Sequence, residues 1–266
     1  MTCDEYLWHL SRRIDTENKK EEASVQKSIN NLKRHLDNWA AADEIREHHE
    51  FGSFVRGTKL PSCIDSSTDV DYMVVFKSTQ LKPESYMEKI RRFANTYYSK
   101  SEIHKDHPTM VIELEKLKFE ITPAIELYGS RYPGYHIPAP QNLALQWIET
   151  YPEQMEIDLK KAEGLNNNLL RPLIQLIKYW NVLNGKPLTS YKIEHNCTSL
   201  VFLGEKTLFN YFIHAAEWVT LNQFLKSDEK KKSEELKKNI EIIKNYHKQG
   251  KESLALLFLQ FVLPKI

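Results

Sequence analysis

Hydrophobic and polar positions in the first half of the chain follow helical spacing in some segments and strand-like alternation in others. Between residues 17 and 41, Val25, Ile29 and Leu32 recur at steps of three and four, which predicts a helix of about 25 residues, roughly 37 Å long. Residues 69–76 alternate and then end in an apolar, β-branched run, as a buried strand does. The same two patterns predict further elements: a helix over residues 83–99 and strands over 110–114 and 117–121.

The second half of the chain has an irregular stretch followed by helical spacing. Residues 123–152 contain five prolines and two glycines, which indicates a covering loop or a domain connector. We therefore expect an α+β fold in which residues 1–150 carry a mixed β-sheet behind a long N-terminal spine helix, and residues 151–266 form a helical lobe. The helices predicted in that lobe span residues 169–183, 191–204, 206–225, 229–249 and 254–263.

The composition is that of an ordinary globular chain. Among 266 residues, 37 Lys and Arg balance 36 Asp and Glu, so bulk charge is not a device for holding nucleic acid. An apolar fraction of 41% supports a sizeable core. Three cysteines are too few for a disulfide framework or a zinc ribbon. No leader peptide or membrane-length apolar run is evident, so we expect a cytoplasmic protein without membrane attachment.

Two carboxylates on the strand at residues 69–76 are the strongest sign of chemistry. Asp69 and Asp71 are two residues apart, so strand alternation directs both side chains to the same face. Like charges this close repel unless a cation neutralises them, and oxygen-only ligands suit Mg²⁺ or Mn²⁺. The alternative is an exposed edge strand with two solvated acids.

A third carboxylate is expected, because phosphoryl transfer through two metal ions commonly uses one. Around Glu120, the apolar residues Leu117, Phe119 and Ile121 face one side of their strand, so Lys118, Glu120 and Thr122 face the other. Glu120 is therefore the candidate. Glu113 and Glu115, on or beside the neighbouring predicted strand, remain alternatives, and Glu120 could also be an ordinary surface residue.

These motifs resemble a known family. The Gly52-Ser53 turn, the Asp69-x-Asp71 pair and a later strand acid resemble the active site of polymerase-β-like nucleotidyltransferases. The fuller pattern resembles the bacterial cGAS/DncV-like nucleotidyltransferases (CD-NTases), which make cyclic oligonucleotide signals in anti-phage defence (CBASS). It consists of Gly52-Ser-Phe-Val-Arg-Gly-Thr58, Ser67-Thr-Asp-Val-Asp71 and Phe119-Glu-Ile-Thr-Pro-Ala124.

For the first lobe, the resemblance implies a set of metal and phosphate ligands. Gly52 and Ser53 would hold the triphosphate, a role that suits a residue without Cβ beside a hydroxyl donor. Asp69 and Asp71 would bind two Mg²⁺ or Mn²⁺ ions. Glu120 would be the third ligand and the base for the attacking hydroxyl. Many relatives carry Asp at that place, so this side chain is one methylene longer.

For the helical lobe, the resemblance implies nucleotide contacts. Lys178 matches the lysine that reaches the donor phosphates, Ser190 a phosphate-contacting serine, and Tyr191 the tyrosine that stacks on the base. Asn166 matches an asparagine that reads the base edge in a pyrimidine-using branch. The residues allow plainer roles too: a surface lysine for Lys178, a helix N-cap for Ser190 and a turn for the Asn run. The nucleoside triphosphates would lie between the lobes.

The resemblance implies that the protein condenses two ribonucleoside triphosphates into a cyclic dinucleotide, with pyrimidine bases as the leading expectation. The product would be read by a separate effector protein, and we expect the synthase to be a monomer. The chain lacks the cysteine-rich zinc insert of animal relatives, so we expect no built-in DNA sensor. Two alternatives are a linear nucleotidyltransferase acting on RNA, a small molecule or a protein, and a non-catalytic nucleotide-binding or RNA-binding module.

Overall fold

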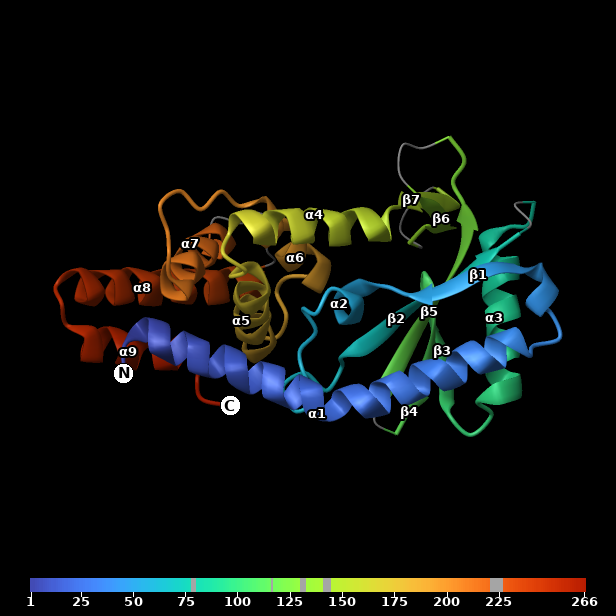
Figure 1. Ribbon diagram of the computed structural model, residues 1–266, viewed down its shortest axis with the longest axis horizontal. Helices are drawn as coiled ribbons and strands as arrows, with labels where there is room; N and C mark the ends of the chain where they lie inside the picture. The colour runs from blue at the N-terminus through green and yellow to red at the C-terminus, as the bar shows by residue number, and fades with distance from the viewer. Residues whose placement is uncertain (78–79, 116, 130–132, 141–144, 221–226) are drawn as a thin grey trace. The chain divides into compact units, whose positions relative to one another are not determined.

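The chain folds into two compact units (Figure 1). A computed structural model describes residues 1–77, 80–115, 117–129, 133–140, 145–220 and 227–266. The sheet unit comprises residues 20–62 and 66–157, and the helical unit comprises residues 1–19, 63–65 and 158–266. Two helices, α1 (Cys3–Asp37) and α4 (Pro152–Leu165), contribute residues to both units. The predicted division of the chain at residue 150 stays a prediction.

The described residues of the sheet unit form a seven-stranded mixed sheet, in agreement with the predicted α+β class. Its main path is β1-β2-β5-β4-β3, and β6 joins β5 to β7. Only the β2–β5 pair among these strands is parallel. The strands are β1 (Ile45–Glu50), β2 (Asp69–Phe76), β3 (Glu102–Asp106), β4 (Thr109–Leu114), β5 (Leu117–Glu126), β6 (Tyr135–Pro138) and β7 (Trp147–Thr150). The remaining elements are η1 (Ala42–Glu44), α2 (Gly52–Val55) and α3 (Pro83–Tyr97).

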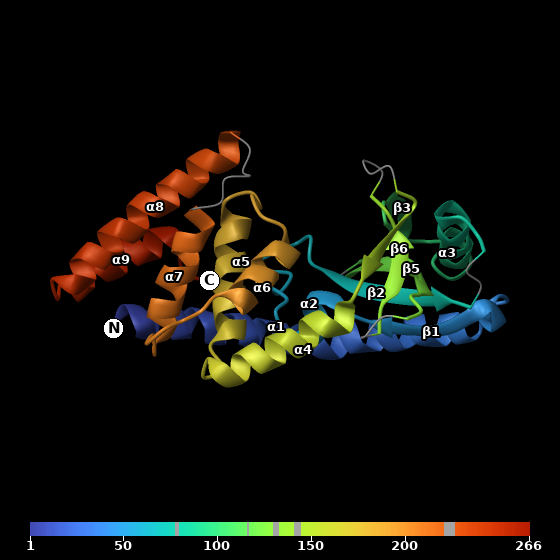
Figure 2. The ribbon, with the colours of Figure 1, turned by 90° about the horizontal axis from the view of Figure 1, so that it is seen from above.

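Strand β2 is internal, lying between β1 and β5, so the alternative of an exposed edge strand is wrong. Its residues Val70, Tyr72 and Val74 belong to the main core of the unit, to which α3 and the second part of α1 also contribute. Figure 2 shows these two helices beside the strands of the sheet. Alternation sends Asp69 and Asp71 to the opposite face. On that face, further along β2, Met73 and Val75 form a smaller core with Ala124 and Tyr135.

The stretch at residues 123–152 is more regular than predicted. Strand β5 continues through Pro123 to Glu126, and β6 and β7 follow. The pairing of β5 with β4 stops at Ile121, and its pairing with β6 starts at Ile125. Pro123 lies between these two points. A missing N–H costs little at such a change of neighbour, so the proline does not end the strand. Residues 130–132 and 141–144 of this stretch lie outside the described residues.

Helix α1 is longer than predicted: it begins at Cys3 and ends at Asp37, so Trp39 lies beyond it. Tyr6, Leu7, Leu10 and Ile14 are buried and continue the helical stripe of the later apolar residues. A polar stretch over residues 15–24 interrupts the hydrophobic pattern, which is why the periodicity alone does not join the two parts.

The helical unit contains most of the predicted helices, with shifted ends. The segment predicted over 191–204 ends early, at Ser199, and residues 221–225 of the segment predicted over 206–225 lie outside the described residues. Within the part of the chain that the structure describes, no helix is both long and apolar enough to cross a membrane. Besides α4, the helices are α5 (Leu170–Leu183), α6 (Ser190–Ser199), α7 (Leu208–Thr220), α8 (Ser227–Lys248) and α9 (Glu252–Val262).

Candidate active site

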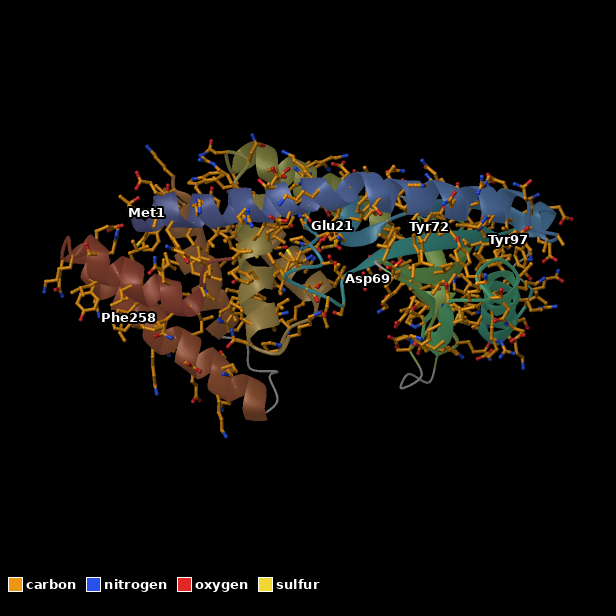
Figure 3. The ribbon with its side chains drawn as sticks, turned by 90° about the horizontal axis from the view of Figure 1, so that it is seen from below. Met1, Glu21, Asp69, Tyr72, Tyr97 and Phe258 are labelled. Atoms are coloured by element: carbon orange, nitrogen blue, oxygen red, sulfur yellow. The ribbon has the colours of Figure 1, made fainter. Side chains whose placement is uncertain are left out.

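The parallel pairing of β2 and β5 brings the predicted acids together. In this register Asp69 lies opposite Lys118, and Asp71 lies opposite Glu120. Paired residues on adjacent strands point to the same face, so all four side chains share the face that lies away from the main core. Asp69 lies at the beginning of β2, three residues before the buried Tyr72 (Figure 3). The alternatives to Glu120 are not on β2 or β5: Glu113 is exposed on β4, where it pairs with Lys118, and Glu115 is an exposed residue in the β4–β5 turn.

The turn at Gly52 is built against Asp71. The backbone N–H of Phe51 donates a hydrogen bond to the Asp71 carbonyl oxygen, 3.1 Å away, and Gly52 begins α2 with φ of +79°. A Cβ on Gly52 would lie 1.8 Å from Asp71 Oδ2. Only glycine satisfies both the backbone conformation and this close approach. The Gly52-Ser53 turn and the second aspartate therefore form one structural feature.

The carboxylates perturb one another. Burial, together with the nearby charges of Asp71 and Glu120, raises the pKa of Asp69 to about 8, and Lys118 offsets part of this effect. Glu120 also forms a hydrogen bond with Asp69. A carboxyl group with a pKa near 8 carries its proton at neutral pH until a cation compensates the cluster. This is the electrostatic signature expected of a cation-binding site.

The donor chemistry of the cluster fits Mg²⁺ or Mn²⁺, since three carboxylates provide oxygen ligands only. The fit is supported by the raised pKa of Asp69 and by the glycine backbone that leaves room beside Asp71. Among the described residues, however, no three His, Cys, Asp or Glu side chains already stand in an arrangement that would hold a metal ion.

The lysine predicted to reach the phosphates is buried. Lys178 on α5 is 5% exposed, so the alternative of a surface lysine is wrong. Its Nζ lies 2.5 Å from Oε1 of Glu194 on α6, which is 1% exposed. Sequence reasoning missed Glu194 because nothing in the linear pattern joins the two helices.

At the start of α6, the predicted N-cap is displaced by one residue. The cap is Thr189, whose hydroxyl accepts from the Lys192 backbone N–H at 3.3 Å, and Ser190 is the first helical residue. Tyr191 is 63% exposed. Its ring is nearly parallel to that of His195, with centroids 5.9 Å apart. An exposed, flat aromatic surface is a suitable platform for a nucleic acid base.

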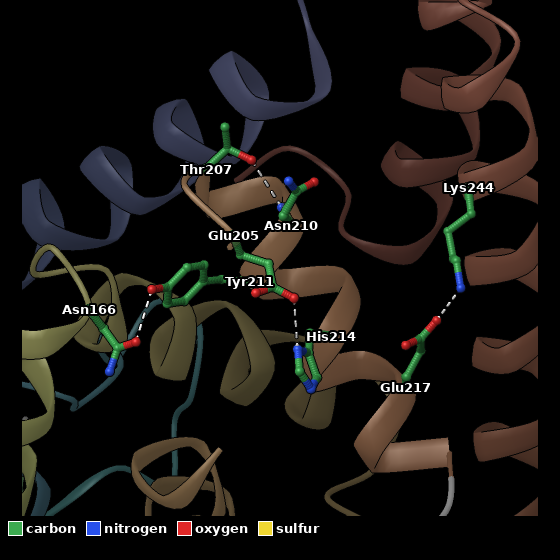
Figure 4. Close-up of polar contacts among 8 residues, drawn as sticks. All are labelled: Asn166, Glu205, Thr207, Asn210, Tyr211, His214, Glu217 and Lys244. Carbon is green, nitrogen blue, oxygen red and sulfur yellow. Dashed lines mark hydrogen bonds and ion pairs between the residues drawn. The ribbon is translucent and has the colours of Figure 1, made fainter. Parts of the chain in front are cut away.

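The side chain of Asn166 is held within the helical unit (Figure 4). Its Oδ1 accepts a hydrogen bond from the Tyr211 hydroxyl at 2.9 Å, and its Nδ2 donates to the Ala162 carbonyl at 2.7 Å. Asn167 and Asn168 adopt positive φ, a conformation that asparagine tolerates better than most residues. The Asn run does form a turn.

Comparison with known proteins identifies the family. Residues 1–162 match the Second Messenger Oligonucleotide or Dinucleotide Synthetase domain, and the chain belongs to this family of nucleotidyltransferases. A probable cyclic nucleotide synthase from Bacillus cereus (strain VD146) is 26% identical over 240 residues, which cover 75% of this chain. The chain spans about two thirds (66%) of that relative's length.

Solved structures agree with this assignment. Escherichia coli MS115-1 CdnC with ATP superposes with a TM-score of 0.68 at 11% identity, covering 97% of this chain and 96% of that one. The Bradyrhizobium diazoefficiens CD-NTase CdnG in complex with GTP gives 0.66 at 10% identity, covering 91% and 92%. The fold is therefore that of the CD-NTases, as the sequence motifs predicted.

Proposed function

We propose that this protein condenses two ribonucleoside triphosphates into a cyclic dinucleotide, with Asp69, Asp71 and Glu120 as the metal-binding acids. The observation that carries the proposal is the close approach of the Gly52 backbone to Asp71 on the face shared with Asp69 and Glu120. A site that brings a phosphate-binding turn against a carboxylate cluster suits a metal-bound triphosphate.

The chemistry consists of two successive transfers. The oxygen of a ribose hydroxyl attacks the α-phosphorus, the bond to the β-phosphate breaks, and pyrophosphate leaves. Glu120 accepts the proton of the attacking hydroxyl, Gly52 and Ser53 bind the phosphates, and Asp69 and Asp71 would hold the metal. Mg²⁺ or Mn²⁺ at these acids would acidify the hydroxyl and offset the phosphate charge. A second transfer closes the ring, and most of the catalysis is positioning and charge compensation.

In the helical unit, we propose that Lys178 and Ser190 contact phosphate and that Tyr191 stacks on a base. The exposure of Tyr191 supports its role. Lys178 would have to exchange its contact with Glu194 for a phosphate oxygen.

We also propose that one base is a pyrimidine read by Asn166. An amide has two N–H donors and two acceptor lone pairs, and the two hydrogen bonds of Asn166 described above use one of each. By resemblance, the product is a second messenger for anti-phage defence, read by a separate effector protein.

The proposal is tested by incubating the protein with all four labelled ribonucleoside triphosphates and Mg²⁺ or Mn²⁺, followed by phosphatase and mass analysis. A phosphatase-resistant dinucleotide is expected, and its mass names the bases. Products that lose their terminal phosphates would indicate a linear nucleotidyltransferase. Triphosphate binding without pyrophosphate release, with either metal, would indicate a non-catalytic module.

A matched pair of variants assigns the third acid. Glu120→Gln should abolish product, whereas Glu113→Gln, which changes an exposed acid one strand further along the sheet, should retain activity. Equal loss in both variants would contradict the assignment of Glu120.

A further inference from the structure

Lys118 lies inside the acid cluster, and the proposed reaction gives it no role. Its Nζ is 2.6 Å from Glu120 Oε1 and 4.0 Å from Asp69 Oδ2. These three side chains are only 20–26% exposed. The position of the ammonium group follows from the register, since Lys118 pairs with Asp69 across the strands and precedes Glu120 by two residues on the same face.

The ammonium group supplies positive charge where the acids need it. Lysine carries a positive charge at neutral pH, and the Lys118 ammonium group lies within hydrogen-bond distance of the Glu120 carboxylate. A partly buried pair of this kind is screened less than one on the open surface.

The extra methylene of Glu120 is consistent with this contact. Residues i and i+2 on one face of a strand are separated by two strand steps of about 3.3 Å each, and two long side chains are needed to bridge that distance. An aspartate at position 120 would reach less far toward the ammonium group. The contact between Glu120 and Lys118 therefore accounts for the length of the glutamate side chain and for the presence of a lysine two residues before it.

We propose that Lys118 is a tethered counter-ion that occupies the acid cluster in the absence of metal and competes with the divalent cation for Glu120 and Asp69. Metal binding then requires the ammonium group to leave Glu120, so Lys118 sets the metal concentration at which the site fills. The inference rests on the proposed function for the identity of the metal-binding acids. The contacts of the Lys118 ammonium group with Glu120 and Asp69 carry the inference.

The test measures metal binding rather than turnover. Nucleotide-free protein is titrated with Mn²⁺, and the free ion is followed by its paramagnetic resonance signal. Lys118→Met should bind Mn²⁺ about tenfold more tightly than the natural protein, because it removes a competing positive charge. Lys118→Arg, which keeps the charge, should stay within about twofold. Lys118→Gln serves as a second neutral variant if the methionine variant unfolds.

Lys89→Met is the matched control. Lys89 is a comparably buried lysine, 17% exposed, that pairs with Glu44 elsewhere in the same unit, so this variant changes the net charge equally without touching the acids. It should leave Mn²⁺ affinity unchanged. A gain in Lys89→Met equal to that in Lys118→Met would overturn the proposal, and so would unchanged or weaker binding in both neutral variants of Lys118.

The two proposals can fail separately. Tighter Mn²⁺ binding by Lys118→Met, with no nucleotide product from the natural protein, would support the counter-ion proposal and refute the proposed synthase activity. Product formation by the natural protein, with unchanged Mn²⁺ affinity in the neutral variants of Lys118, would support the synthase activity and refute the counter-ion proposal. Absence of Mn²⁺ binding in every variant would overturn the counter-ion, since no ion would then compete with it.

Discussion

The two units of the protein each contain buried charge, but they handle it differently. In the sheet unit, like charges gather, and their repulsion together with burial raises the pKa of Asp69 to about 8. In the helical unit, Lys178 meets Glu194, an opposite charge, at 2.5 Å, and both are almost fully buried. Like charges held together are costly without a ligand. A buried pair of opposite charges needs no ligand, and breaking it is what costs stability. The first arrangement therefore indicates a cation site, and in the second the loss of either partner should destabilise the fold.

The largest expected effect separates activity from stability in the sheet unit. Asp69→Asn should lower product formation by about 10³-fold or more, since a metal ligand contributes several kcal/mol to the transition state. Stability at neutral pH should change by only about 0.5 kcal/mol, because Asn resembles the protonated carboxyl that the raised pKa implies. Product mass analysis and urea unfolding of metal-free protein measure the two effects. Asp43→Asn, an exposed acid in the same unit, should alter neither, and full activity of Asp69→Asn would refute the metal assignment.

In the helical unit a large effect on stability is expected, in addition to the loss of the proposed phosphate contact. Lys178→Met leaves Glu194 buried without this partner, which should cost about 3–5 kcal/mol of unfolding free energy. The double variant Lys178→Met with Glu194→Met should regain much of that loss, because no buried charge is then uncompensated. Urea unfolding of both variants provides the comparison. If Lys178→Met proved as stable as the natural protein, the pair would have no structural role and the contrast between the units would fail.

A substitution of Gly52 should have a smaller effect, on both stability and activity. Gly52→Ala combines strain at positive φ with a clash against Asp71, and we expect about 1–3 kcal/mol of lost stability together with a clear loss of activity. Gly185→Ala is the matched control, since Gly185 has φ of +81° but open space around its Cβ position. It should lose less stability, because it has the strain without the clash, and it should keep its activity. Equal activities of the two variants would mean that the approach to Asp71 has no catalytic importance.

The smallest effect concerns a carboxylate whose pKa shifts in the direction opposite to that of Asp69. Burial alone would raise the pKa of Glu252, but hydrogen bonds from the Cys3 backbone N–H and from His247 lower it. Its stabilising contribution is thus fully present above its ordinary value of 4.5 and is lost as pH falls through the lowered pKa.

Glu252→Gln should therefore cost about 0.5–1 kcal/mol at pH 7, a modest amount because solvent screens this partly exposed group. The difference from the natural protein should shrink in acid. Urea unfolding at neutral and acidic pH measures this, and a difference that grows as the pH falls would contradict the assignment.

Local patterns predicted much of the fold but misjudged several boundaries. The strand at residues 69–76 and the helix at 169–183 are close to β2 and α5, because each has an uninterrupted pattern. The first part of α1 was missed because polar residues separate its apolar stripe from the second part. The continuation of β5 past Pro123 was missed because a proline is tolerated there only through the change of neighbouring strands.

The sequence by itself determined the same-face acids of β2 and the glycine-serine turn, because strand alternation and the freedom of glycine are properties of short segments. Tertiary structure decided which charges meet. Lys118 lies beside Asp69 through the register of two strands that are distant in the chain, and Lys178 contacts Glu194 through the packing of two helices. Electrostatic energy depends on distance in space and on burial rather than on separation along the chain. The balance between a ligand site and a structural ion pair was therefore fixed only by the fold.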